Sequence, residues 1–182
     1  WFDWTSYLDV LWWPKVDTTI SKKKFTNLGS QISSVPNSFK LGIQATKIFD
    51  DRKKMNEGVL EINWGFAENM AYATLLSESF PIRISGQDVR RGTFSHRHAC
   101  VFDKEDGQGF IPLSKIAEAH NTRFDIYDSL LSEEAVLGFE YGYSATWPTG
   151  LTIWEAQFGD FVNGAQVVID QFIVSAQHKW ER

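Results

Sequence analysis

The sequence predicts an α/β domain built around a parallel sheet, and two observations carry this prediction. From about residue 60, short apolar runs of four to six residues alternate with longer segments of helical periodicity. This alternation is typical of strands joined by crossover helices, an arrangement that makes neighbouring strands parallel. The most polar stretches also fall directly after the predicted strands. In parallel sheets ligands bind beyond the carboxyl ends of the strands, so the loops there are the candidate site.

Two helices are expected before the first strand. Residues 40–56 have a polar helical pattern, which Glu57 and Gly58 end. Residues 67–76 form a stronger, apolar helix, whose core face is expected to carry Met70, Ala71, Thr74 and Leu75.

Three strands and two further helices follow in alternation. Strands are expected at 82–85, 124–127 and 151–154. A helix is expected at 133–143, with Ser132 as its N-cap, and another at 163–175. The loops to inspect are therefore 85–98, 128–134 and 155–162.

Composition and charge exclude several classes of protein. The formal net charge of -5 argues against nucleic-acid binding, and no apolar run approaches the roughly 20 residues of a membrane-spanning helix. The one cysteine, Cys100, excludes an internal disulfide and fits a reducing compartment. The chain starts at Trp1 without an initiator Met or a signal peptide, so we expect an internal piece of a longer protein.

The first 30 residues are unusually aromatic. Trp1, Phe2, Trp4, Trp12 and Trp13 precede a run of three lysines at 22–24. Aromatic side chains at this density seldom remain in water as a free tail. We expect this segment to pack on another part of a larger protein or on a second subunit.

Each of the three loops allows a functional and a plain structural interpretation. In 128–134, Glu133 is either a first-turn helix former behind the cap Ser132 or a carboxylate held at the crevice by the helix dipole. In 155–162, Gln157 and Phe161 either line a pocket for a flat heteroaromatic ring or belong to ordinary packing around a turn.

The segment 86–98 is the densest polar run. His96 and His98 form a His-x-His pair, but no cysteine or third ligand lies nearby at zinc spacing, so we predict no metal site. Its three arginines suit an anionic substrate or subunit contacts, and surface salt bridges are the alternative. The sequence contains neither a phosphate-binding glycine loop nor a Gly-x-Ser-x-Gly motif. These residues alone therefore indicate an α/β domain with a polar crevice.

Longer motifs carry a resemblance to a known family. They are SGQDV at 85–89, RGTFSHRH at 91–98, SLLSEEAVLGFEYGY at 129–143, WEAQFGDF at 154–161, NGAQ at 163–166 and IDQFI at 169–173. The chain resembles the pyrimidine-binding domain of the thiamine diphosphate-dependent, decarboxylating component of 2-oxoglutarate dehydrogenase complexes. The resemblance is strong over 63–182, looser over 33–56 and faint before that. The RGTFSHRH run separates it from the pyruvate and branched-chain relatives.

The resemblance implies a fold and a division of the chain. The family's domain is a three-layer α/β/α structure with a mainly parallel sheet, transketolase-like, here preceded by a helical and aromatic segment. We expect residues 1–59 to be a connecting segment and 60–182 to be the pyrimidine-binding domain, truncated at its C-terminal end. The chain departs from the family's pattern at 99–104 and 144–150, where loop packing should differ.

The resemblance also implies roles for individual residues. The family's activating glutamate falls on Glu133, which would hydrogen-bond the ring nitrogen of the cofactor's pyrimidine and so help the cofactor to lose its C2 proton. Gln157 and Phe161 match positions that line the pyrimidine pocket. His96 and His98 would lie near the entrance, with a substrate or structural role.

The implied reaction is decarboxylation of 2-oxoglutarate and transfer of the succinyl group to a lipoyl group in the tricarboxylic acid cycle. Thiamine diphosphate would be bound together with magnesium, which residues outside this chain would hold. The implied partners are a second subunit in a homodimer, the dihydrolipoyl succinyltransferase and dihydrolipoyl dehydrogenase. The location would be the cytoplasm in bacteria or the mitochondrial matrix in eukaryotes. A non-catalytic dimerisation fragment and an enzyme for another 2-oxo acid are the alternatives.

Overall fold

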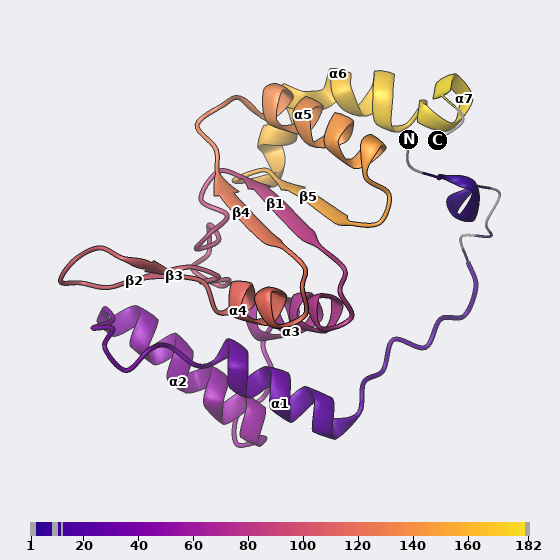
Figure 1. Ribbon diagram of the computed structural model, residues 1–182. Coiled ribbons are helices and arrows are strands. Elements are labelled where there is room, and N and C mark those ends of the chain that lie inside the picture. The colour runs from indigo at the N-terminus through magenta and orange to yellow at the C-terminus, as the bar shows by residue number, and fades with distance from the viewer. Residues whose placement is uncertain (1–2, 9–10, 12, 181–182) are drawn as a thin grey trace.

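A parallel three-stranded sheet forms the centre of the chain (Figure 1). The computed structural model describes residues 3–8, 11 and 13–180, apart from the side chains at 177 and 180. Its strands are β1 (Ile82–Gly86), β4 (Phe124–Asp128) and β5 (Leu151–Glu155), in the order β4-β1-β5. In this register Gly86 lies between Asp128 and Glu155, so the three carboxyl ends meet at one edge. The three predicted strands are confirmed.

Helices cover both faces of the sheet. Helices α3 (Trp64–Ser77) and α4 (Pro112–Ala119) lie on one face, and α5 (Glu133–Thr146) lies on the other with the C-terminal segment beyond it (Figure 1). Ile82 and Ile84 of β1 are buried against the α3 side, in the main hydrophobic core. Alternate residues of a strand point to opposite faces, so Arg83 and Ser85 face α5. The predicted three-layer α/β/α fold is confirmed.

Two further helices pack outside α3 and α4. They are α1 (Lys22–Ile32) and α2 (Ile43–Glu57), and their side chains Leu28, Ile32 and Met55 belong to the same core as Phe66 of α3. Helix α2 ends as the sequence predicts, with Gly58 in the left-handed region at φ +77°. The expected division between residues 59 and 60 stays a prediction, although the two parts share this core.

The helix starts follow local capping chemistry. The Asn63 side chain accepts a hydrogen bond from the amide of Phe66 at 2.9 Å, and Ser132 accepts one from Ala135 at 3.5 Å. The predicted core face of α3 is wrong in part, because Ala71 is exposed whereas Ala73 is buried. Helix α3 lies between the sheet and α1, so it is buried on two sides and a single periodic stripe does not describe it.

The C-terminal segment is helical but irregular. Its pieces are η2 (Gly159–Ala165), α6 (Gln166–Val168), the π-helical turn η3 (Ile169–Ile173) and α7 (Ala176–Trp180). One regular helix over 163–175 is therefore a wrong prediction. Gly164 disfavours α-helix near the start of this segment, which begins instead as a 3₁₀ helix. Helices α1 and α4 and the hairpin of β2 (Val101–Phe102) and β3 (Gly109–Phe110) are not predicted from the sequence.

The aromatic N-terminal segment extends away from α1 and α2 (Figure 1). Of its predicted cluster, Trp1, Phe2 and Trp12 lie outside the described residues. Trp4 packs edge-on against Tyr7 of η1 (Thr5–Tyr7), with ring centroids 5.8 Å apart, and Trp13 is largely exposed. Packing of this segment on another part of the protein or on a second subunit stays a prediction. Among the described residues, no helix is long and apolar enough to cross a membrane.

Candidate functional site

The loops that follow the three strands contact one another at the carboxyl edge, through hydrogen bonds and close backbone packing. The amide of Ser129 donates to the carbonyl of Gly86 at 2.7 Å, and the amide of Arg90 donates to Asp128 Oδ1 at 3.0 Å. Gly86 has φ +151°, and a Cβ there would lie 2.1 Å from the carbonyl oxygen of Glu155. Only glycine fits this close approach of β1 and β5. The three loops therefore form one fixed surface.

Glu133 lies in the first turn of α5, directly above this edge, as the sequence predicts. Its carboxylate is half-buried, and Gln87 Nε2 donates to its Oε1 at 3.3 Å. The other oxygen, Oε2, faces Gly164 of η2, where an added Cβ would lie 3.4 Å away. The free amides and the dipole of the helix N-terminus favour a negative charge at this position. Glu133 thus has one carboxylate oxygen hydrogen-bonded to Gln87 and the other beside Gly164.

Gln157 and Phe161 lie in the segment that joins β5 to α6. Gln157 is half-buried, and the ring of Phe161 is 44% exposed, as is that of Phe158. These two rings meet edge-on, with centroids 5.9 Å apart, and Phe94 of the 86–98 loop packs edge-on against Phe158 at 6.1 Å. Flat aromatic surface is therefore accessible beside the carboxyl edge, in the same segment that carries Gly164.

The two histidines of the His-x-His pair have different surroundings. The His96 ring is half-buried near Phe94, and its Nε2 lies 3.7 Å from Glu68 Oε2. His98 is buried, with Nδ1 3.1 Å from the carbonyl of Ser95. Burial, together with the cation of Arg52, lowers the pKa of His98. His96 is therefore the one of the two that is accessible at the loop surface, and His98 belongs to the interior.

Arg97, between the histidines, is a residue that the sequence analysis did not single out. Its side chain is 2% exposed and pairs with Glu68 of α3 at 2.6 Å and with Glu155 at the end of β5. It also donates to the carbonyl of Val89 at 2.9 Å. Burial alone would lower the pKa of Arg97, but its bonds to Glu155 and Glu68 outweigh burial and raise it. The one available signal was the basic run that contains it, which does not say which side chain points inward.

This network includes three groups at metal-ligand distance from one another. One ligand atom each of Glu68, His96 and Glu155 lies within 4.8 Å of the others. The guanidinium of Arg97 already bonds both carboxylates, so a built-in cation takes the place that a metal ion would need. The arrangement favours a structural clamp that joins α3, the 86–98 loop and β5.

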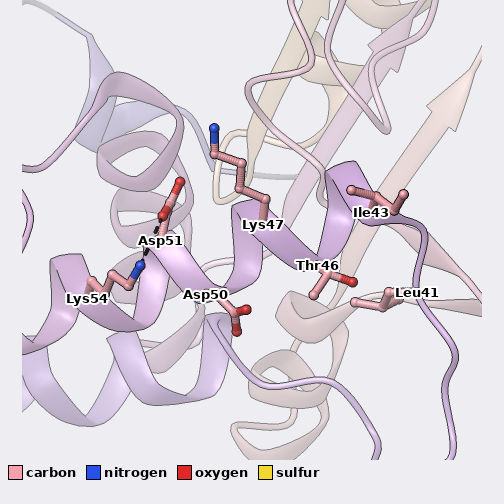
Figure 2. Close-up of a pocket in the computed structure, with 7 residues that line it drawn as sticks. All are labelled: Leu41, Ile43, Thr46, Lys47, Asp50, Asp51 and Lys54. Carbon is pink, nitrogen blue, oxygen red and sulfur yellow. Dashed lines mark ion pairs between the residues drawn. The ribbon is translucent and has the colours of Figure 1, made fainter.

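Two hollows of the described part of the chain are lined by residues other than Glu133, Gln157 and Phe161. One of about 440 Å³ lies along α2, on the far side of the sheet from α5. Figure 2 shows it lined by Leu41, Ile43 and charged side chains that include the Asp51–Lys54 pair. Alternating charges on an exposed helical face are typical of a solvated surface. A second hollow of about 260 Å³ lies between β1, β4 and α5, beside the carboxyl edge.

Comparison with known families agrees with this geometry. The family model for the transketolase pyrimidine-binding domain matches residues 61–182. The chain belongs to this family. The match begins just before α3 and includes every strand of the sheet and the loops that carry Glu133, Gln157 and Phe161.

Individual relatives share the whole length of the chain. It is similar to the 2-oxoglutarate dehydrogenase E1 component of Azotobacter vinelandii, with 52% identity over 178 residues, 98% of the chain and 19% of that protein. The E1 components of Haemophilus influenzae and Coxiella burnetii are 50% and 51% identical over 180 residues, 99% of the chain and 19% of each relative. The chain thus spans about a fifth of the length of the curated relatives it matches.

Proposed function

We propose that this chain forms the pyrimidine-binding half of the active site of a 2-oxoglutarate dehydrogenase E1 component. The observation that carries the proposal is the position of Glu133, in the first turn of α5 at the carboxyl edge of a parallel sheet. The names of relatives that are about half identical over nearly the whole chain support the substrate. The reaction is the decarboxylation of 2-oxoglutarate with succinyl transfer to a lipoyl group.

The residues at the carboxyl edge fit the pyrimidine ring of thiamine diphosphate. This ring is flat, and one of its nitrogens needs a carboxyl group to share a proton. Glu133 supplies that carboxyl group at the carboxyl edge, and the exposed faces of Phe158 and Phe161 suit a heteroaromatic ring. When bound, the cofactor supplies the nucleophilic carbon that attacks the keto acid.

The protein's own contribution is to hold and move a proton. Glu133 shares a proton with the ring nitrogen, as a general acid and base that works through the cofactor. Gln157 and Phe161 line the ring, and His96 lies on the accessible side of the 86–98 loop, where it is placed to meet the substrate. His98 has a structural role here, since it is buried and bonded to the backbone.

This chain supplies half a site. The groups that bind the diphosphate and magnesium belong to another domain, which a second subunit of a homodimer presents. The further partners are the lipoyl-bearing dihydrolipoyl succinyltransferase and dihydrolipoyl dehydrogenase. The reaction takes place in the bacterial cytoplasm or, in a eukaryote, in the mitochondrial matrix.

The test uses the full-length protein with thiamine diphosphate and magnesium. Carbon dioxide release is measured with 2-oxoglutarate, pyruvate and branched-chain 2-oxo acids. We expect turnover with 2-oxoglutarate in clear preference to the others, and none from residues 1–182 alone. Preference for another acid would contradict the substrate, and no turnover with any acid would point to a non-catalytic dimerisation role.

A further inference from the structure

A seam of polar side chains joins β1 to α5. Arg83 on the α5 face of β1 bonds Glu140, and Gln87 just beyond the strand bonds Glu133. Glu133 and Glu140 are seven residues apart, about two turns of one helix face. Between the two pairs, the hydroxyl of Ser85 is buried without a hydrogen-bond partner in the described part of the chain. Each pair thus joins one donor, in β1 or directly after it, to one carboxylate of α5.

The Arg83–Glu140 pair sets where α5 lies along β1. Nε of Arg83 bonds both carboxylate oxygens, at 2.8 and 3.0 Å, and the two side chains are only 16% and 3% exposed. The guanidinium also lies over the rings of Tyr127, Phe139 and Tyr143, at 4.8–5.2 Å from their centroids. A helical slip of one residue would break all of these contacts. The pair therefore fixes the height at which Glu133 meets the end of β1.

Gln87 is fixed from the other side by the backbone of the carboxyl edge. The residue before it, Gly86, accepts the bond from Ser129, and Arg90, three residues on, donates to Asp128. Arg90 Nε also donates to the carbonyl of Ile126 at 3.2 Å. These bonds join the loop after β1 to the loop that leads into α5, so the amide of Gln87 and the carboxylate of Glu133 keep a constant separation.

We propose that Gln87 is a positioning residue that holds the Glu133 carboxylate by Oε1 and thereby leaves Oε2 free for the pyrimidine ring. The proposal rests on the proposed function of Glu133. A neutral amide donor bonded to one carboxylate oxygen restricts the rotation of the carboxylate, without adding a charge that would compete with the ring nitrogen. Gln87 therefore orients the carboxylate of Glu133.

The test compares variants of the full-length protein loaded with thiamine diphosphate and magnesium. Gln87→Leu removes the donor, and Gln87→Glu replaces it with a second carboxylate. Gln166→Leu is the matched control, because Gln166 makes the same amide–carboxylate bond, to Asp170 at 2.8 Å, on the exposed surface. Hydrogen–deuterium exchange at the cofactor's C2 is measured at one pH with the protein saturated with cofactor. Cofactor binding is measured separately, from the rise in melting temperature with thiamine diphosphate concentration.

The Gln87–Glu133 hydrogen bond, at 3.3 Å, is long for a charge-assisted bond. Its loss should therefore slow C2 exchange by about tenfold, which corresponds to the weakest hydrogen bonds to charged groups. Exchange should slow in Gln87→Glu as well, because a carboxylate cannot donate a hydrogen bond to Oε1 of Glu133. Cofactor binding should weaken in both, and Gln166→Leu should match wild type in every measurement.

Two results distinguish a failure of the positioning role of Gln87 from a failure of the proposed function of Glu133. If Glu133→Gln exchanges at the wild-type rate, the proposed function of Glu133 is itself wrong. If Glu133→Gln is slow but the exchange rate and cofactor binding of Gln87→Leu equal those of wild type, only the positioning role is overturned. A purely structural role for Gln87 would lower the melting temperature without slowing C2 exchange, and that result also rejects the proposal.

Discussion

Removal of Glu140 should loosen helix α5 without touching the candidate site directly. In Glu140→Leu the guanidinium of Arg83, 16% exposed in the wild type, is left among three rings without its carboxylate. Breaking a buried ion pair by removing one partner typically destabilises a protein by about 3–5 kcal/mol. The three rings still attract the cation of Arg83, so we expect a destabilisation at the lower end of this range, about 3 kcal/mol. This corresponds to about 10²-fold faster amide exchange in α5 by local opening.

The assay is hydrogen exchange with mass spectrometry on the full-length protein, read on peptides that cover α5. Glu118→Leu is the control, because Glu118 pairs with Lys115 on the surface, with side chains 63% and 61% exposed, and such pairs contribute about 0–1 kcal/mol. The double variant Arg83→Met with Glu140→Leu replaces the pair by apolar groups and should return to within about 1 kcal/mol of wild type. Protection of α5 in Glu140→Leu equal to that in Glu118→Leu would refute this reasoning.

Three further outcomes follow from single residues. Gly58→Ala places a side chain at φ +77° in open space, so urea unfolding should show a loss of about 1–2 kcal/mol from backbone strain alone. Burial and Arg52 lower the pKa of His98, so on acidification the unfolded chain binds a proton at a higher pH than the folded chain does. The free energy of unfolding should therefore fall as the pH drops below 6.5, the ordinary pKa of histidine, toward the lower pKa of His98 in the folded protein. His98→Asn should flatten this fall in melting temperature between about pH 7.5 and 5.5. Burial raises the pKa of the Cys100 thiol, so iodoacetamide should label it only after unfolding.

Local signals in the sequence predicted the elements that position the site. The strands at 82–85, 124–127 and 151–154 are short apolar runs whose bounds differ from the structure by one residue at most. Ser132 and Gly58 mark a helix start and a helix end by capping chemistry, which depends on neighbouring residues only. Glu133 could therefore be placed at a strand's carboxyl end before its spatial neighbours were known.

The contacts that hold the site could not be predicted in this way. Gln87 and Glu133 are 46 residues apart, and Arg97 and Glu155 are 58 apart, so no local pattern links them. His96, Arg97 and His98 are adjacent in the sequence, yet only the fold decides that Arg97 is buried between two carboxylates and that His96 stays partly exposed. Helix α1 was missed because its lysine-rich start and its single glycine obscure the apolar stripe of Leu28 and Ile32.

The most direct test of the central claim is hydrogen–deuterium exchange at C2 of thiamine diphosphate bound to full-length Glu133→Gln. Glutamine keeps the size of the side chain but cannot share a proton with the ring nitrogen. Exchange should slow by about 10²–10⁴-fold, the usual effect of losing one acid–base group. The melting temperature should change little, because the lost helix-dipole interaction contributes only about 0.3–1 kcal/mol. Exchange at the wild-type rate in an intact fold would mean that Glu133 is only a helix former.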